Sequence, residues 1–255
     1  MAQLKVINYG HPLLRERAQE MTGVDEQMLA IIRDMGDTMY RNAGIGLAGP
    51  QVGLMQRVFV VGFNRPEMES DEEWTNSDDA DDEAGDEEFE DEEFEDDEYD
   101  EEDEEDEEDE EDEDFGYVAE LGGQLSDFEG RGLHVFINPE ILEESAEDGP
   151  YEEGCLSIPG VRGEVYRPRR VTVRALDEKY QPFEITASGL LARVIQHELD
   201  HLNGVLFVDH LPLVKRTLVA MDLNRIKRET MDELPSLEGA KYPIALGEPE
   251  AAEAP

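Results

Sequence analysis

Apolar residues recur at helical spacing in three parts of the chain. Over 25–40 they fall every three or four positions, and Asp25 can accept hydrogen bonds from the first free backbone N–H groups, which predicts an amphipathic helix with Asp25 as its N-cap. The same spacing over 189–202, preceded by Ser188 as a candidate N-cap, predicts a second helix. A third amphipathic pattern over 212–229 predicts a C-terminal helix. The apolar positions of the first two helices are Met28, Ile32, Met35 and Met39, and Leu191, Ile195, Leu199 and Leu202.

Short runs of β-branched and aromatic residues predict the strands. RVFVVGF at 57–63 and HVFINPE at 134–140 are two such runs, and three more follow with Pro, Gly or Asp turn residues between them. Those three runs are 161–168, 169–179 and 181–188. Successive strands with helices at both ends indicate an α+β fold. We therefore expect antiparallel sheets flanking a central helix at 189–202, with a further helix near the C-terminus.

Composition changes this picture between the first two predicted strands. Residues 67–114 hold 36 Asp and Glu among 48 residues and no Lys or Arg, so like charges repel and too few apolar groups are present to offset the chain entropy lost on folding. We expect a long disordered acidic insertion there, because the entropic cost of a loop rises only logarithmically with its length. A single catalytic domain would then comprise 1–66 and 115–234, followed by a flexible tail at 235–255.

The charge balance limits the classes of partner. The chain carries 67 acidic and 21 basic residues, a formal charge of −46, and outside the insertion the charge is only about −10. This balance argues against binding to DNA or to an anionic membrane surface. The N-terminus lacks the apolar core of a signal peptide, and no run approaches the roughly 20 apolar residues that span a bilayer. We therefore expect a cytoplasmic protein that binds neither DNA nor membranes.

The helix at 189–202 carries the candidate chemistry in an HExxH motif. His197 and His201 are four residues apart, about one helical turn, so both imidazoles project from one face and could bind one metal ion. Glu198 stands where zinc proteases have the carboxylate that activates the bound water. The third ligand is open at this point. Downstream candidates are Asp209, His210 and Asp222; upstream, the segment YEEGCLSIPG contains Cys155, the only cysteine, which has no partner for an internal disulfide.

Three separated motifs resemble the signature segments of peptide deformylase. They are GIGLAGPQ at 44–51, EGCLS at 153–157 and QHELDH at 196–201, and the resemblance covers nearly the whole chain outside the acidic run and the tail. It implies a hydrolase of protein biosynthesis that removes the formyl group from N-formylmethionine at the N-terminus of nascent polypeptides and releases formate. It also implies one divalent metal ion per chain, Fe2+ in the cell, with Zn2+, Ni2+ or Co2+ as alternatives.

The resemblance implies roles around the metal. Cys155, His197 and His201 would be the three protein ligands, with the fourth position open for water. A deprotonated thiolate suits a divalent transition metal, and an open position distinguishes a catalytic from a structural site. Glu198 would be the general base and then the general acid. Glu153 would orient the metal ligands through hydrogen bonds.

The resemblance also implies how substrate is bound. The side-chain amide of Gln51 and the backbone N–H of Leu156 would stabilise the developing oxyanion. The substrate-binding residues would be Ile45 and Gly46 beside the peptide, Arg162 at its backbone, and Tyr151, Leu190, Arg193 and Val194 around the methionine side chain. Gly49 departs from the family pattern, which usually has Ala there, and we expect the missing methyl to loosen the turn that carries Gln51.

Two other functions stay open from the sequence. One is a metallopeptidase that uses the histidine pair and a downstream ligand; the other is a binding protein in which the acidic run is the working part. The predicted C-terminal helix also carries a cluster of bases, which supports the hypothesis that it touches the ribosome, as in some relatives, or is simply a solvated face. These bases are Lys215, Arg216, Arg225, Lys227 and Arg228.

Overall fold

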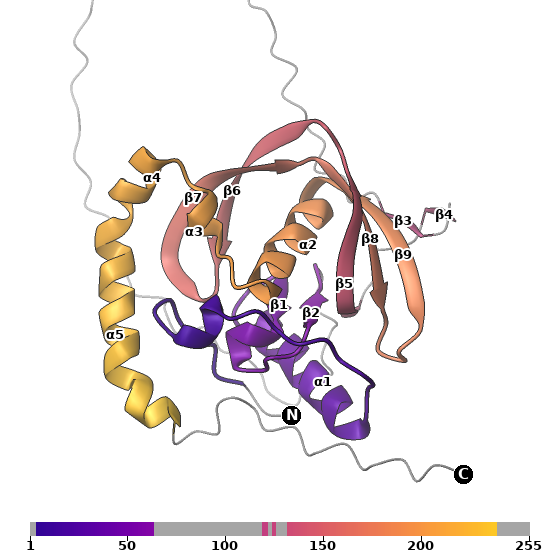
Figure 1. The fold of residues 1–255 in the computed structure, drawn as a ribbon, viewed down its shortest axis with the longest axis horizontal. Helices are drawn as coiled ribbons and strands as arrows, with labels where there is room; N and C mark the ends of the chain where they lie inside the picture. The colour runs from indigo at the N-terminus through magenta and orange to yellow at the C-terminus, as the bar shows by residue number, and fades with distance from the viewer. Residues whose placement is uncertain (1–3, 64–118, 122–123, 126–131, 239–255) are drawn as a thin grey trace, which may run out of the picture. The chain divides into compact units, whose positions relative to one another are not determined.

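The protein, represented by a computed structural model, is described over residues 4–63, 119–121, 124–125 and 132–238 (Figure 1). The acidic run at 67–114 and the chain beyond 238 lie outside these residues, so the predicted disorder there stays a prediction. The helices are η1 (Pro12–Arg15), α1 (Glu26–Arg41), η2 (Gly49–Val52), α2 (Gly189–Leu202), α3 (Phe207–His210), α4 (Leu213–Leu218) and α5 (Ala220–Glu238). The strands are β1 (Gly46–Ala48), β2 (Val58–Val61), β3 (Ala119–Leu121), β4 (Gln124–Leu125), β5 (His134–Glu144), β6 (Asp148–Cys155), β7 (Ile158–Pro168), β8 (Arg170–Leu176) and β9 (Pro182–Ser188).

The strands form a seven-stranded sheet in the order β1-β2-β5-β8-β9-β3-β4 and a separate β6–β7 hairpin, with antiparallel pairing in both. The expectation of a mixed fold with antiparallel sheets is therefore confirmed. β2 and β5 are direct neighbours, with Phe59 opposite Phe136. In sequence, β3 and β4 come between β2 and β5, and β3 joins the other side of the same sheet by pairing with β9.

Helix α2 packs against strands of both sheets, β1, β2, β8 and β9 on one side and β7 of the hairpin (Figure 1). Its apolar residues Leu191, Ile195 and Leu202 are fully buried in one cluster with the stacked rings of Phe59 and Phe136. Full burial of one such side chain stabilises the fold by about 1.5–3 kcal/mol. The helix is therefore a rigid base for the polar side chains on its other face.

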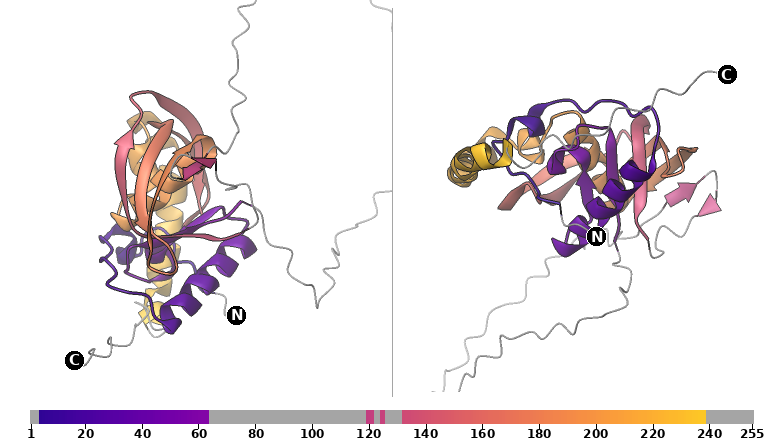
Figure 2. Two further views of the ribbon diagram at one scale, coloured as in Figure 1. Left: turned by 90° about the vertical axis from the view of Figure 1, so that its right-hand side faces the viewer. Right: turned by 90° about the horizontal axis from the view of Figure 1, so that it is seen from below.

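Helix α1 forms as its pattern predicts. The Asp25 side chain accepts a 2.7 Å hydrogen bond from the Met28 backbone N–H, and Met28, Ile32, Met35 and Met39 are buried against β2 and β5 residues. Such a cap contributes about 1 kcal/mol. Figure 2 shows α1 alongside β1 and β2, which it contacts. This packing supports the sheet edge from which β1 faces the cavity described below.

The predicted C-terminal helix over 212–229 is wrong in its boundaries, because the structure has two helices, α4 and α5, with Val219 between them. The two have different packing partners. Ion pairs join Lys215 to Glu164 on β7 and Arg216 to Asp209 on α3, whereas Leu223 and Ile226 of α5 are buried.

α5 also continues to Glu238, so the first four residues of the predicted tail, 235–238, are helical. The helix continues through Pro235, which is unfavourable in a helix interior, and ends directly before the glycine at position 239. Arg225, like Lys215 and Arg216, pairs with nearby acids, Asp222 and Glu229. Three of the five bases in the predicted cluster therefore already have acidic partners, and the ribosome contact stays a hypothesis. No helix within the described ranges is long and apolar enough to cross a membrane.

Candidate active site

Cys155, His197 and His201 converge although they are up to 46 positions apart in the sequence. Their candidate ligand atoms lie within 4.8 Å of one another, with the Cys155 Sγ 3.2 Å from the His201 Nε2, and the two imidazole rings are 5.0 Å apart between centroids. α2 supplies both histidines from one face, and an irregularity between Gly154 and Cys155 at the end of β6 places the thiol opposite them. One sulfur and two imidazole nitrogens make a donor set suited to a divalent transition metal.

The charges in this cluster favour ligation through the sulfur, whereas a metal ion must displace a proton from His197. Burial raises the pKa of the Cys155 thiol, but His201 and His197 lower it more, so that it falls from 9.0 to about 5. Burial lowers the pKa of His197, and its hydrogen bonds to Cys155 and Glu153 raise it well above 6.5. The sulfur is therefore a thiolate at neutral pH, which is the form that binds metals.

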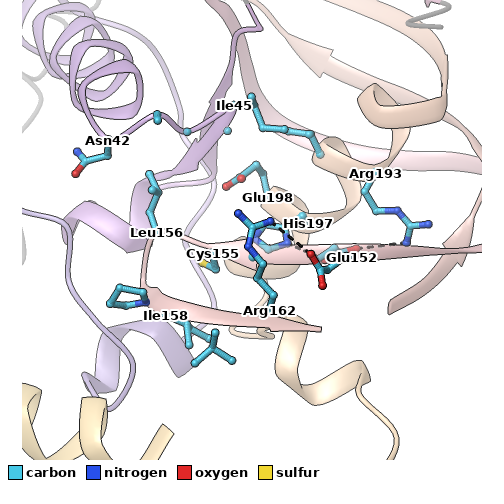
Figure 3. Close-up of a pocket in the computed structure, with 18 of the residues that line it drawn as sticks. Asn42, Ile45, Glu152, Cys155, Leu156, Ile158, Arg162, Arg193, His197 and Glu198 are labelled. Carbon is cyan, nitrogen blue, oxygen red and sulfur yellow. Dashed lines mark hydrogen bonds and ion pairs between the residues drawn. The ribbon is translucent and has the colours of Figure 1, made fainter. Parts of the chain in front are cut away.

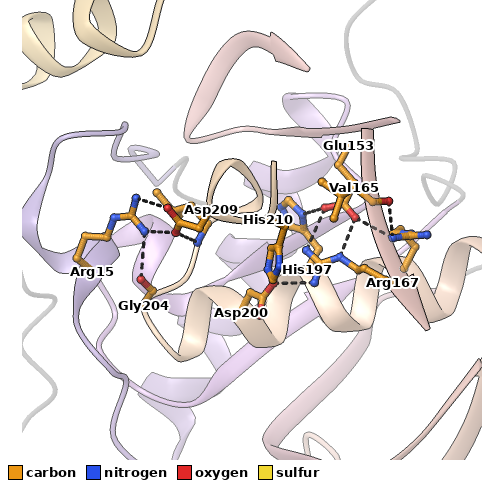
Figure 4. A network of polar contacts seen from close by, with 11 residues as sticks. Arg15, Glu153, Val165, Arg167, His197, Asp200, Gly204, Asp209 and His210 are labelled. Atoms are coloured by element: carbon orange, nitrogen blue, oxygen red, sulfur yellow. Dashed lines mark hydrogen bonds and ion pairs between the residues drawn. The ribbon is translucent and has the colours of Figure 1, made fainter. Parts of the chain in front are cut away.

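Glu153 lies behind His197 and is held from several directions (Figure 4). Its Oε2 accepts a 2.9 Å hydrogen bond from the His197 Nδ1, which leaves the Nε2 of that ring for a metal. Arg167 donates to both carboxylate oxygens at 2.8 and 3.1 Å, and Arg193 donates to Oε1 at 3.3 Å. Burial raises the pKa of Glu153, but His197 and Arg167 lower it by more, so that it falls from 4.5 to about 2. Glu153 is therefore a fixed anion.

Arg167 was missed by the sequence reasoning. It lies on β7, is only 5% exposed, and also donates a 2.7 Å hydrogen bond to Asp200 on α2. The same Asp200 oxygen accepts a 2.8 Å hydrogen bond from His210. A signal was available, because Arg167 is two residues after the buried Val165 and so shares its side of the strand. A positively charged side chain on the buried side of a strand indicates a buried ion pair.

Glu198 has the opposite surroundings. It is 3% exposed, and its Oε2 has no hydrogen-bond partner among the described residues. Burial raises its pKa from 4.5 to about 7 although His197 and His201 oppose this shift. Gly46 on β1 faces it so closely that a Cβ there would lie 2.4 Å from the Glu198 Oε1. Any larger residue at position 46 would displace the Glu198 carboxylate. With a pKa of about 7, this carboxylate can accept or donate a proton at neutral pH.

Gln51 points its amide NH2 toward the thiol. Its Oε1 accepts a 2.7 Å hydrogen bond from the Ala48 N–H, and its Nε2 is 3.4 Å from both the Cys155 Sγ and the Ser157 Oγ. The expected loosening of its turn by Gly49 is not what the structure has. A Cβ at Gly49 would lie 2.6 Å from the Leu54 carbonyl oxygen, so the space for a methyl is filled by backbone and the turn is tight.

The extended N-terminal segment ties two parts of the site together. The Ile7 N–H donates to the Gln51 carbonyl at 2.8 Å, and the Tyr9 N–H donates to the Ser157 carbonyl at 2.8 Å. Gln51 belongs to η2 and Ser157 to the turn between β6 and β7. These two backbone bonds therefore fix the amide of Gln51 relative to the turn that contains Leu156.

A cavity of about 650 Å3 opens onto this cluster. Figure 3 shows Cys155, His197 and Glu198 at its centre, between Leu156 and Arg193. The cavity is lined by all the substrate-binding residues expected from the sequence, namely Ile45, Gly46, Tyr151, Arg162, Leu190, Arg193 and Val194, and also by Gln51 and Glu153. His201 does not line it and lies behind the thiol, 1% exposed.

The cavity wall also contains residues that the motifs did not indicate. Asn42, Glu152, Pro159 and Gly160 line it, and Glu152 forms a 3.7 Å ion pair with the largely exposed Arg162. The sequence gives no local signal for them, since they become neighbours only through the β6–β7 hairpin and the end of α1. All four residues are exposed, so they form part of the solvent-facing wall of the cavity.

The downstream candidates for a third metal ligand have other partners. Asp209 pairs with Arg15 and Arg216, His210 with Asp200, and Asp222 with Arg225. The cluster within 4.8 Å contains Cys155 instead. Among the described residues, therefore, none of the three downstream candidates joins the histidine pair, and the hypothesis of a metallopeptidase with a downstream third ligand has no support.

Comparisons with known proteins agree with this geometry. A family model described as polypeptide deformylase matches residues 3–217. The peptide deformylase of Christiangramia forsetii is 35% identical over 225 residues, 88% of this chain and 90% of the relative, and that of Salinibacter ruber is 33% identical over 247 residues, 97% and 96%. A crystal structure of a peptide deformylase from Legionella pneumophila has a TM-score of 0.61 at 30% identity and covers 90% of this chain and 98% of that one. The chain belongs to the peptide deformylase family, whose members are enzymes that remove N-formyl groups from nascent peptides.

Proposed function

We propose that this enzyme hydrolyses the formyl group of N-formylmethionine on nascent polypeptides in the cytoplasm and releases formate, with the help of one divalent metal ion. The observation that carries the proposal is the convergence of Cys155, His197 and His201 beside the unpaired oxygen of Glu198. Three ligands with a carboxylate next to the open side are the arrangement of a hydrolytic rather than a structural metal site.

Cys155, His197 and His201 would hold the ion, because their donor set fits Fe2+, Zn2+, Ni2+ or Co2+. When bound, such an ion supplies Lewis acidity and lowers the pKa of a coordinated water toward about 7. Glu153 keeps the His197 ring in the orientation that ligation needs, through the 2.9 Å bond to Nδ1.

Glu198 handles the proton. As a carboxylate with a raised pKa in a buried position, it can accept a proton from the attacking water and later give it to the departing amine. The same oxygen can serve in both steps because no described protein group occupies it. The amine leaves as the free N-terminus of methionine and the acyl part leaves as formate.

Gln51 and Leu156 would stabilise the negative charge that develops on the formyl oxygen. The side-chain Oε1 of Gln51 accepts a hydrogen bond from the Ala48 N–H, so the side-chain NH2 is kept facing the site without reorganisation. The backbone N–H of Leu156 follows directly after the thiol ligand. Removing one such donor costs about 10²–10³-fold in kcat.

The peptide would bind along β1. This strand is at one end of the seven-stranded order and pairs only with β2 within the described sheet, so its other edge can pair with an extended chain. Ile45 and Gly46 lie at this edge. The methionine side chain would enter the pocket walled by Tyr151, Leu190, Arg193 and Val194, while Arg162 would contact the peptide backbone at the mouth.

A formate-release assay with a formyl-methionyl peptide tests the proposal. Purified protein loaded with Fe2+ without oxygen, or with Ni2+, should release formate. Cys155→Ala should lose both the metal, measured by mass spectrometry, and the activity. His210→Ala, which changes a histidine outside the ligand cluster, is the matched control and should keep its metal. A metal-loaded wild type that releases no formate would overturn the proposal, and cleavage of internal peptide bonds that persists in Cys155→Ser would support a metallopeptidase instead.

A further inference from the structure

Arg193 belongs both to the wall of the substrate pocket and to the polar network behind the metal ligands. It lines the cavity on α2, is 9% exposed, and its guanidinium carbon lies 5.8 Å from the centre of the Tyr151 ring. It also donates to Glu153. Arg167, the other arginine on Glu153, does not line the cavity. Arg193 is therefore the cation that can contact both a bound side chain and this carboxylate.

The contacts of the two arginines differ in strength. Arg167 holds both oxygens of Glu153 at 2.8 and 3.1 Å and is itself held by Asp200 at 2.7 Å. Arg193 is anchored by one nitrogen on the Gly149 carbonyl at 2.7 Å, and its other nitrogen is shared between the Val165 carbonyl at 3.2 Å and Glu153 at 3.3 Å. The shared contact is long for a charge-assisted hydrogen bond, and so it has room to shorten.

From Arg193 the path to the metal ligand is short. Its nitrogen reaches the Oε1 of Glu153, and the Oε2 of the same carboxylate accepts the 2.9 Å hydrogen bond from His197. Building on the proposed function, we propose that Arg193 is a positioning residue that couples occupation of the side-chain pocket by the substrate to the orientation of His197. The substrate side chain is then not only bound but also adjusts the metal site.

The physical reason is the local dielectric. A side chain that fills the pocket displaces water from the guanidinium, and a charge pair attracts more strongly when water is excluded. The Arg193–Glu153 contact shortens, and the carboxylate moves with it. Hydrogen bonds of this kind tune the basicity and direction of a histidine ligand. A methionine side chain should therefore raise kcat and not only lower KM, because part of its binding energy is used at the reacting centre.

A spectroscopic experiment reads the metal site without turnover. The protein is loaded with Co2+, and its visible absorption is followed while the deformylated peptides Met-Ala-Ser or Ala-Ala-Ser are added, with calorimetry reporting peptide affinity. The wild type should show a band shift with Met-Ala-Ser and a smaller one with Ala-Ala-Ser. Arg193→Met, which keeps the chain length but removes the charge, should bind the methionyl peptide with less than half the wild-type shift. Arg174→Met, a change at an exposed strand arginine paired with Glu184, is the matched control and should show the full shift.

Kinetics give the second measurement. The ratio of kcat for formyl-methionyl over formyl-alanyl peptide should fall about tenfold in Arg193→Met, a size typical of groups that support a metal ligand, while the ratio of KM changes less. Arg193→Lys keeps the charge, but one ammonium cannot serve both Gly149 and Glu153 in the geometry of a guanidinium, so it should give an intermediate ratio.

The outcomes separate this inference from the proposed function. A wild type that releases no formate defeats the proposed function. An active wild type together with an Arg193→Met variant that keeps the full band shift and the wild-type kcat ratio overturns the coupling. If circular dichroism shows that Arg193→Met does not fold, Arg193→Lys is tested instead. A wild-type band shift and kcat ratio in Arg193→Lys overturn the coupling, and intermediate values of both support it.

Discussion

Two buried glutamates, Glu153 and Glu198, both interact with His197 and differ in almost every other respect. Both are at most 5% exposed, and burial raises the pKa of each. The pKa of Glu153 falls to about 2 because His197 and Arg167 stabilise its charge, whereas the pKa of Glu198 rises to about 7 and one of its oxygens has no partner among the described residues. Burial alone does not decide what a carboxylate does. Its partners make one a permanent anion that orients a ligand and leave the other able to exchange protons.

The largest effect should come from removing the proton carrier. Glu198→Gln keeps the size of the side chain but cannot accept a proton, so kcat for formate release should fall by about 10²–10⁴-fold. The metal content, measured by mass spectrometry, should stay at the wild-type level because Glu198 is not among the three ligands. Activity within threefold of wild type would remove Glu198 from its proposed role.

A smaller loss should follow from crowding the same carboxylate. Gly46→Ala places a Cβ 2.4 Å from the Glu198 Oε1 and forces it to move, and a displacement of about 1 Å at a reacting group can cost up to about 100-fold in rate. Gly23→Ala is the matched control, since a Cβ there meets nothing within 4 Å. Equal formate-release rates in the two variants would contradict the close approach of β1 to Glu198.

A change at Glu153, the hydrogen-bond partner of His197, should appear in metal affinity and stability. Glu153→Gln should weaken metal binding about 10–100-fold, because the amide holds the ring less firmly. In the metal-free protein it should also lower the free energy of unfolding by about 3 kcal/mol at pH 7, as the two buried arginines lose their counter-charge.

The pH dependence of that stability difference has a definite sign. The folded pKa of Glu153 is lowered from 4.5 to about 2, so its contribution is complete above about pH 4.5 and is lost as the pH falls toward 2. Urea unfolding of metal-free wild type and Glu153→Gln should give curves that converge over that window. Glu184→Gln, which alters an exposed pair with Arg174, should differ little from wild type at any pH. A difference that grows as the pH falls would contradict the assignment.

The smallest effect should come from the outer end of the network. His210→Ala removes the bond to Asp200, but the His210 side chain is 36% exposed and solvent screens the interaction. The free energy of unfolding should change by less than about 1 kcal/mol. A thermal melt and a metal titration would measure this. A loss as large as that of Glu153→Gln would mean that the network acts as one unit, and not through its inner members alone.

The periodicity of apolar residues predicted the helices and strands that are determined by local sequence. It found α1 with its cap at Asp25 and the helix that became α2, and runs of β-branched residues located β2, β5 and β7 to β9. It did not find β1 or β6, because three residues are too few for a pattern and β6 is rich in Gly, Pro and acids. It merged α4 and α5, since the partners that separate them are distant in sequence.

The site residues were predicted from sequence motifs, so residues outside those motifs were missed. The resemblance indicated Cys155, His197 and Glu198, and the structure brings them together. It gave no hint of the contact between Arg167 and Asp200 or of that between Arg193 and Glu153, which join α2 to the hairpin across 33 and 40 positions. Such pairs arise from the register of β6 against β7 and the packing of α2 on them, which no single segment of sequence encodes.

The two backbone bonds from Ile7 and Tyr9 also set an order of events during synthesis. Both donors are made among the first ten residues, yet the Ser157 carbonyl follows 148 positions after Tyr9, which at roughly 5–20 residues per second is on the order of ten seconds later. The earliest part of the chain must therefore wait for partners made much later. A half-made copy, even one that already contains Gln51, lacks the acceptor that joins the two turns.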